Sequence, residues 1–347
     1  MKNYFQEFQS DFYAFLSFCA SMLYGNQKII ETLDQYLDQF FKTGKGVPFF
    51  ILVGPRGIGK SSHAQTLIQK YLGNFYPNDF LYFKDYSDQI GKKHAIPVEL
   101  NERNRFISKS SKKEEDSDNS NEETWESKGE KYPNLWIREM ISRLQTAPLG
   151  DKKIVLIEDL QRAYSEWQNA LLKTLEEPLK QRVIIATLQE ENQILPTILS
   201  RAIVLHLTPL SDKEMEHFIQ QIPKDLLPQN QQITKIISEM AMGRPGIFLS
   251  LLEKSKGNPE LLSALPLLFS NTEAKVSTPI YTLQKHFQKI IETGLINEFV
   301  DGWINHCIKE NNPQEAQRRI EAKRIADSLA KSGVSWERLF LSLMISK

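Results

Sequence analysis

The stretch Phe49–Ser61, FFILVGPRGIGKS, decides the fold, because a short apolar run passes directly into a loop with three glycines. The apolar run is typical of a buried strand, and Ser62–Leu72, which follows the loop, is compatible with a helix. From Gly54 to Ser61 the spacing fits the P-loop pattern G-x-x-x-x-G-K-[ST]. A glycine-rich turn with a chance lysine is the alternative, and the flanking strand and helix argue against it.

The residue types of this loop suit a bound phosphate. Glycines let successive backbone N–H groups turn inward, and the helix that follows presents its positive end to the same phosphates. We expect the loop to bind ATP or ADP, with the Lys60 ammonium on the β- and γ-phosphates of the triphosphate and the Ser61 hydroxyl on Mg²⁺. The predicted nucleotide-binding residues are Gly54, Pro55, Arg56, Gly57, Ile58, Gly59, Lys60, Ser61 and Ser62.

Composition sets wide bounds on the rest of the chain. Its 347 residues allow two to three domains, and 43 basic residues balance 43 acidic ones, so net charge gives no reason to expect nucleic-acid binding by this chain alone. Cys19 and Cys307 form neither a disulfide framework nor a metal cluster, which suits a reducing cytoplasm. The apolar run at 12–24 lacks a basic flank and is too short to span a bilayer, so we expect no membrane contact.

Apolar runs and helical patterns alternate through the first part of the chain, which predicts an α/β fold with a five-stranded parallel sheet. Besides the strand before the P-loop, four buried strands are expected at 79–84, 152–157, 183–187 and 202–207, and helices at 26–37, 135–144 and 166–176. From Ser211 onward only helices are expected, starting with the capping box Ser211–Glu214 and ending with bundle helices at 279–308 and 315–345. Residues 108–131 are almost wholly polar and are expected to form a disordered insertion, or alternatively a docking segment anchored by Trp125.

Two acids follow the strand at 152–157, where a nucleotide-hydrolysing P-loop fold needs a carboxylate for Mg²⁺ and often a second one for the attacking water. Here Glu158 takes the metal position and Asp159 the position of the base, which reverses the usual order. A shift of about 1 Å in a catalytic group can cost about a hundredfold in rate, whereas Mg²⁺ keeps several waters and tolerates the exchange. The pair therefore favours nucleotide binding over turnover, unless it is merely two surface acids.

Two further segments carry a resemblance to a known family. Asn169–Pro178, NALLKTLEEP, strongly resembles the helix after the acidic motif in bacterial clamp-loader ATPases. Leu195–Ala202, LPTILSRA, resembles their Ser-Arg-Cys motif, with Ala202 in place of the cysteine. With the P-loop, the similarity spans residues 20–255 and points to an AAA+ subunit of the DNA polymerase III clamp loader, most similar to the delta-prime branch, with gamma/tau as the related alternative.

This resemblance implies roles for individual residues. Arg201 would be an arginine finger that reaches the γ-phosphate of a neighbouring subunit, and Thr187 falls near the position that senses the γ-phosphate. Gly246 stands where active subunits carry a lid arginine, with Arg244 two residues earlier. The four zinc-binding cysteines of the motor subunits are missing, so no zinc site is expected. Burial of Arg201 within its own fold would exclude its role in trans.

The resemblance also implies an organisation and a set of partners. Residues 1–208 would form the P-loop domain, 209–256 a helical lid, and 257–347 a helical collar that joins the chain to other clamp-loader subunits in a ring. The ring would load a sliding clamp onto primer–template DNA, with this chain completing a neighbour's ATPase site while its own turnover is weak or absent. Two alternatives stay open: an active motor subunit of the same machine, and a free-standing P-loop kinase or NTPase.

Overall fold

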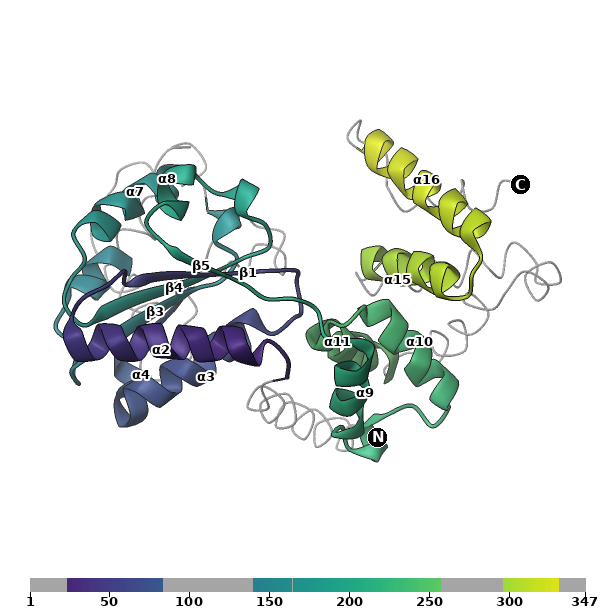
Figure 1. The fold of residues 1–347 in the computed structure, drawn as a ribbon, viewed down its shortest axis with the longest axis horizontal. Helices are drawn as coiled ribbons and strands as arrows, with labels where there is room; N and C mark the ends of the chain where they lie inside the picture. The colour runs from purple at the N-terminus through teal and green to yellow at the C-terminus, as the bar shows by residue number, and fades with distance from the viewer. Residues whose placement is uncertain (1–23, 84–139, 164, 257–295, 331–347) are drawn as a thin grey trace, which may run out of the picture. The chain divides into compact units, whose positions relative to one another are not determined.

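The computed structural model describes residues 24–83, 140–163, 165–256 and 296–330, which Figure 1 colours along the chain. The chain divides into two compact units, the first drawn from Met1–Pro55 and Gly59–Thr208 and the second from Arg56–Ile58 and Pro209–Lys347. The leader before residue 24, the polar segment 108–131 and the predicted boundary at 257 lie outside the described residues.

The first unit is built on a five-stranded sheet with the order β2-β3-β4-β1-β5 (Figure 1). All neighbouring strands are parallel, which confirms the predicted α/β class. The strands are β1 (Phe49–Val53), β2 (Phe80–Phe83), β3 (Lys153–Ile157), β4 (Arg182–Leu188) and β5 (Ile203–His206).

The prediction that every strand is buried was wrong for β5. In β1, β2 and β3 every residue is buried, whereas Ile203–Leu205 of β5 are half-buried and His206 is exposed. β5 lies at one edge of the sheet and pairs only with β1, but β2 at the other edge is buried along its whole length, so an edge position permits exposure without by itself causing it. An apolar run alone does not distinguish an edge strand from a central one.

Helices cover both faces of this sheet. Figure 1 shows α2 (Gln27–Thr43), α3 (Lys60–Leu72) and α4 (Tyr76–Asp79) on one side of the strands, and α7 (Ser165–Glu176) and α8 (Pro196–Leu199) on the other. On the second side, one core joins alternate strand residues to helical residues. Its members include Phe49, Ile51, Val155, Ile157 and Ile184 from the sheet, and Met140, Leu144, Leu171, Leu175 and Ile198 from the helices.

The helix bounds depart from the predictions at their ends. Of the helix predicted over 135–144, the described part covers residues 140–145. The P-loop helix begins at Lys60 instead of Ser62, and α2 continues six residues past Leu37, as far as Thr43. Gly44 ends α2 in a left-handed conformation and donates its N–H to the carbonyl of Phe40, so the backbone supplies the stop signal.

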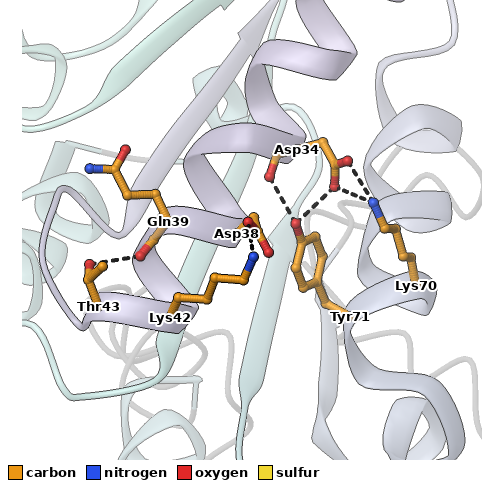
Figure 2. Close-up of polar contacts among 7 residues, drawn as sticks. All are labelled: Asp34, Asp38, Gln39, Lys42, Thr43, Lys70 and Tyr71. Carbon is orange, nitrogen blue, oxygen red and sulfur yellow. Dashed lines mark hydrogen bonds and ion pairs between the residues drawn. The ribbon is translucent and has the colours of Figure 1, made fainter.

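Polar side chains join α2 to α3 across the surface of the first unit. Figure 2 shows the Tyr71 hydroxyl and the Lys70 ammonium of α3 both turned toward Asp34 of α2. The hydroxyl lies 2.8 Å from the Asp34 carbonyl oxygen and 2.9 Å from its Oδ1, while Lys70 Nζ lies 2.6 Å from Oδ2. Burial, together with the hydrogen bond to Asp34, raises the pKa of Tyr71 well above its usual value. The contact therefore keeps a neutral phenol beside the carboxylate.

The described part of the second unit is helical apart from its turns. It contains α9 (Asp212–Gln220), α10 (Gln231–Ala241), α11 (Pro245–Lys256), α15 (Ile296–Lys309) and α16 (Pro313–Ala330). The Ser211 capping box is confirmed: its hydroxyl accepts from the Glu214 N–H while the Glu214 carboxylate accepts from the Ser211 N–H. Gly243, between α10 and α11, has φ +70°, and a Cβ there would lie 2.2 Å from the Leu210 carbonyl oxygen. Glycine is therefore required at this turn.

Close packing joins α10, α15 and α16. A Cβ on Gly302 would lie 2.3 Å from Cα of Met240, so α15 meets α10 with the two backbones in near contact. His306 Nδ1 lies 2.6 Å from the Glu239 carboxylate across the same pair of helices. Arg319 of α16 is buried, with its guanidinium 3.6 Å from the centre of the Trp303 ring. None of the described helices is both long and apolar enough to cross a lipid bilayer.

Candidate nucleotide-binding site

Sheet topology brings the predicted site residues of the first unit to one edge. The P-loop follows the end of β1, the acids Glu158 and Asp159 follow the end of β3, and Thr187 lies near the end of β4. Because β4 lies between β1 and β3, and neighbouring strands are about 4.8 Å apart, the P-loop and the acids begin about 10 Å from each other. A triphosphate with its metal ion fits between groups at that spacing.

The P-loop has the backbone that an anion site needs. Gly59 adopts φ +94° as the N-cap of α3, and Gly57 adopts φ +85°, conformations that other residues rarely reach. The first turn of α3 holds no acidic residue that could neutralise the positive end of the helix. Pro55 and Arg56 are exposed, whereas Ile58 is buried. Ser61 and Ser62 are half-buried at the start of α3.

Lys60 is buried with its amine turned onto the loop itself. Its side-chain nitrogen donates to the carbonyl oxygens of Gly54 at 2.6 Å and Pro55 at 3.0 Å. Burial lowers the pKa of Lys60, and the nearby charges of Asp159 and Glu158 oppose that shift. An ammonium held by two neutral carbonyls in a buried site gains from a phosphate partner, since charge-assisted hydrogen bonds are about twice as strong as neutral ones. The residues present therefore fit a bound nucleotide.

Asp159 is held by its own neighbours. Its backbone is left-handed, with φ +50°, and its N–H donates to Thr187 Oγ1 at 2.9 Å. Gln161 Nε2 donates to its Oδ1 at 3.1 Å, and Arg162 Nε lies 3.9 Å from its Oδ2. Both carboxylate oxygens thus face groups of the short helix η5 (Leu160–Arg162). A general base needs a carboxylate aimed at water, and these contacts compete with that role.

Glu158 and Thr187 are placed as the strand pattern predicts. The N–H of Glu158 donates to the carbonyl of Phe83 at 2.8 Å, which extends the β2–β3 ladder by one residue, and its half-buried carboxylate acts on the pKa of Lys60. Thr187 is 1% exposed, and its hydroxyl oxygen accepts from Asp159. The sensor role of Thr187 stays a prediction. Among the described residues, His, Cys, Asp and Glu side chains form no group of three that could hold a metal ion.

Arg201 lies on the surface of the first unit, and its hydrogen bonds and ion pair with the described residues do not include the P-loop or the acids. Its side chain is 35% exposed, and its contacts lie at the ends of α7 and α8. The guanidinium donates to the carbonyl oxygen of Thr197 at 2.9 Å and to the Glu176 carboxylate at 2.8 Å. Ala202 beside it is partly buried and packs against the core of the first unit. The burial that would exclude a role in trans is not found.

Within the second unit, Gly246 donates its N–H to the carbonyl oxygen of Gly57 at 2.8 Å. A Cβ on Gly246 would lie 3.0 Å from that oxygen, so a lid arginine at this position would require the backbone of Gly57 to shift by a few tenths of an ångström. Arg244 donates through Nε to the carbonyl of Ala241 at the end of α10. This hydrogen bond ties the Arg244 side chain to the end of α10, beside the turn that leads to α11.

Sequence reasoning missed four residues that shape these sites. Gln161 and Arg162 hold Asp159, and the i,i+3 spacing of Arg162 from Asp159 was the available signal. Glu176 lies in the segment that carries the family resemblance, yet nothing local predicts its contact with Arg201, 25 positions away. His63 is 2% exposed and lies against Gly59, and burial lowers its pKa to about 4.

Comparisons with known proteins find similar sequences and folds. Residues 99–211 match the family described as "DNA polymerase III, delta subunit". DNA polymerase III subunit gamma of Buchnera aphidicola is 32% identical over 138 residues, 38% of this chain and 38% of that protein. DNA polymerase III subunit delta' of Pseudomonas aeruginosa is 42% identical over 60 residues, 17% of this chain and 18% of that protein. The chain thus spans less than half the length of these two relatives.

A solved structure of a DNA polymerase III gamma subunit-related protein from Thermotoga maritima aligns with a TM-score of 0.45 at 15% identity, covering 90% of this chain and 96% of that one. The similarity rests on the sequence matches, which include the delta', gamma and tau subunits. Over the matched parts, the chain is therefore similar to DNA polymerase III subunits of these three kinds.

Proposed function

We propose that this chain is a delta-prime-like subunit of the clamp loader, which binds ATP or ADP and supplies Arg201 to the ATPase site of a neighbouring subunit. Its partners would be other clamp-loader subunits in a hetero-oligomeric ring, the sliding clamp, and primer–template DNA held by the assembled ring. Residues 209–256 would serve as the lid, and residues 257–347 as the collar that joins the ring.

Nucleotide would be held by Gly54–Ser62. The backbone N–H groups of the loop and the start of α3 would bind the phosphates, and Lys60 would exchange the carbonyls of Gly54 and Pro55 for phosphate oxygens. Mg²⁺ would be held by the Ser61 hydroxyl and the Glu158 carboxylate, which are the hard oxygen ligands it prefers. A bound metal ion would neutralise charge on the phosphates.

Weak turnover at this chain's own site follows from the contacts of Asp159. A carboxylate that accepts from Gln161 and faces the Arg162 guanidinium has fewer acceptor sites left to polarise water. The reversed order of Glu158 and Asp159 adds a displacement of the carboxyl groups, and rate falls steeply with misplacement of a catalytic group.

The observation that carries the proposal is the exposure of the Arg201 side chain, 35%, at a place where its contacts lie on α7 and α8 and not on the P-loop. A guanidinium so placed is available to a second molecule. An arginine that reaches the transferred phosphoryl group contributes about 10³–10⁵ in rate. A single side chain can thus set the turnover of a neighbouring subunit.

The test is reconstitution of the chain with its candidate partner subunits and measurement of ATPase, with and without clamp and primed DNA. We expect Arg201→Ala to lower kcat of the complex at least a hundredfold while assembly on a sizing column is unchanged. Arg201→Lys keeps the charge but lacks the planar fork, and should restore only a small part of the loss. Unchanged turnover with Arg201→Ala would contradict the trans role.

A catalytically active motor subunit is the second candidate, favoured by the intact P-loop with Lys60 close to both acids. Lys60→Ala separates the two candidates within the reconstituted complex. For a delta-prime-like subunit, Lys60→Ala leaves most of the turnover in place and Arg201→Ala removes it. For a motor subunit, Lys60→Ala and Glu158→Ala each remove the share of turnover that this chain performs.

A further inference from the structure

Glu176 and Arg201 form an ion pair that joins the end of α7 to the end of α8. Arg201 Nη2 lies 2.8 Å from Glu176 Oε1, and the two side chains are 35% and 54% exposed. On its other side, Arg201 Nη1 donates to the carbonyl oxygen of Thr197 at 2.9 Å and lies 3.4 Å from Ser200 Oγ. The guanidinium is thus held by Glu176 on one side and by Thr197 and Ser200 on the other.

We propose that Glu176 is a positioning residue for Arg201, which holds the guanidinium in the orientation that a neighbouring subunit's phosphate requires. This inference rests on the proposed function, because it takes the trans role of Arg201 as given. Neither the resemblance nor the comparisons assign a role to Glu176.

These contacts leave some N–H donors of the Arg201 guanidinium available to another ligand. Arginine has five N–H donors, and the contacts with Thr197, Ser200 and Glu176 engage Nη1 and one side of Nη2. Nε–H and the second Nη2–H have no hydrogen-bond partner in the part of the chain that the structure describes. These donors are available to an oxyanion such as a phosphate, whose oxygens accept hydrogen bonds from guanidinium N–H groups.

Glu176 can hold Arg201 in place because its own helix is anchored. Leu171 and Leu175 of α7 are buried in the core of the first unit, and Ile198 of α8 lies in the same core. An arginine side chain otherwise loses about 2 kcal/mol of rotamer freedom when it is fixed by a ligand. A pair that fixes the side chain beforehand removes part of that cost at the moment of the reaction.

The neighbouring residue Glu177 offers a matched control. It carries the same charge one position along the chain and is exposed. Its side chain makes no hydrogen bond or ion pair with the described residues. A general effect of negative charge at the end of α7 would therefore act through both positions, whereas positioning acts through Glu176 alone.

The experiment measures ATPase of the reconstituted complex with four versions of this chain: wild type, Glu176→Ala, Glu176→Gln and Glu177→Ala. Exposed ion pairs have a modest strength, so we expect Glu176→Ala to lower kcat about two- to fivefold with little change in KM for ATP. Glu176→Gln keeps an oxygen that accepts from Nη2 and should restore most of kcat. Glu177→Ala should match wild type.

A higher kcat for Glu176→Ala would overturn the proposal, because it would mean that the carboxylate restrains the arginine. Equal kcat for all four versions would overturn it as well. If Arg201→Ala leaves turnover unchanged, the proposed function fails separately. In that case the isolated chain still tests whether Glu176 holds Arg201: ¹⁵N relaxation should show a more mobile Arg201 side chain in Glu176→Ala than in Glu177→Ala, and equal mobility would refute the positioning.

Discussion

Acidification should destabilise the first unit through His63, which lies in the first turns of α3 against Gly59. The side chain is 2% exposed, and burial, opposed only in part by a hydrogen bond with the backbone of Tyr24, lowers its pKa from 6.5 to about 4. Nδ1 has no hydrogen-bond partner among the described residues. The fold therefore requires the neutral imidazole.

The sign and size of the effect follow from linkage. The pKa of His63 is lower in the folded than in the unfolded chain, so the unfolded state binds a proton more tightly. The contribution of His63 to the free energy of unfolding is therefore fully present above about pH 6.5 and is lost as the pH falls toward about 4. With these two pKa values, the free energy of unfolding should be lower by about 2 kcal/mol at about pH 5 than at about pH 7.5. The full difference between the pKa values corresponds to about 3 kcal/mol.

The assay must report on the first unit alone, since the chain has two units and need not unfold in one step. Urea unfolding read by hydrogen exchange of peptides from β1 and β4 meets this need. His63→Gln removes the titration while its amide nitrogen can still donate, and His217→Gln removes an exposed histidine of α9 as the matched control. We expect wild type and His217→Gln to lose about 2 kcal/mol more than His63→Gln over this pH range. Parallel losses in all three proteins would refute the neutral imidazole.

Three further predictions concern single side chains. Lys60→Ala should weaken ATP or ADP binding about ten- to hundredfold by calorimetry, because a hydrogen bond to a charged group contributes about 1.5–3 kcal/mol, and unchanged affinity would place the nucleotide elsewhere. Gly243→Ala should destabilise the second unit by about 2 kcal/mol or more in urea, since alanine at φ +70° is strained and its Cβ meets the Leu210 carbonyl. Tyr71→Phe removes the hydroxyl bound to Asp34 and should cost the first unit about 1 kcal/mol, which thermal unfolding would detect.

Much of the fold could be predicted because buried strands and helices produce recognisable patterns of apolar residues in the sequence. The five strands alternate with helices as predicted, and the capping box at Ser211 begins α9. The order of strands could not be predicted, because side-chain patterns record burial and not the identity of the neighbouring strand. For the same reason β5 was expected to be as buried as β1, and the difference between the two edge strands, exposed β5 and buried β2, could not be predicted.

At the site, the functional residues could be predicted but their contact partners could not. The glycines, Lys60 and the acid pair were predicted because their spacing reflects a backbone shape and a common sheet edge. The partners of those residues were not, since they come from short connections such as η5, whose three residues carry no periodic pattern. Gln161 and Arg162 act only because Asp159 enters η5 in a left-handed conformation, which no hydrophobic pattern indicates.

The contacts of Asp159 and of Arg201 suit these two charged groups to different roles. The partners of Asp159, Gln161 and Arg162, follow it closely in the chain, and they compete with water for its carboxylate oxygens. The partners of Arg201 come from two helices anchored in the core, and they leave Nε–H and one Nη2–H without a partner among the described residues. A carboxylate that is tied locally and a guanidinium that is held in an exposed orientation are the combination expected of a subunit whose chemistry is completed at its boundary with another molecule.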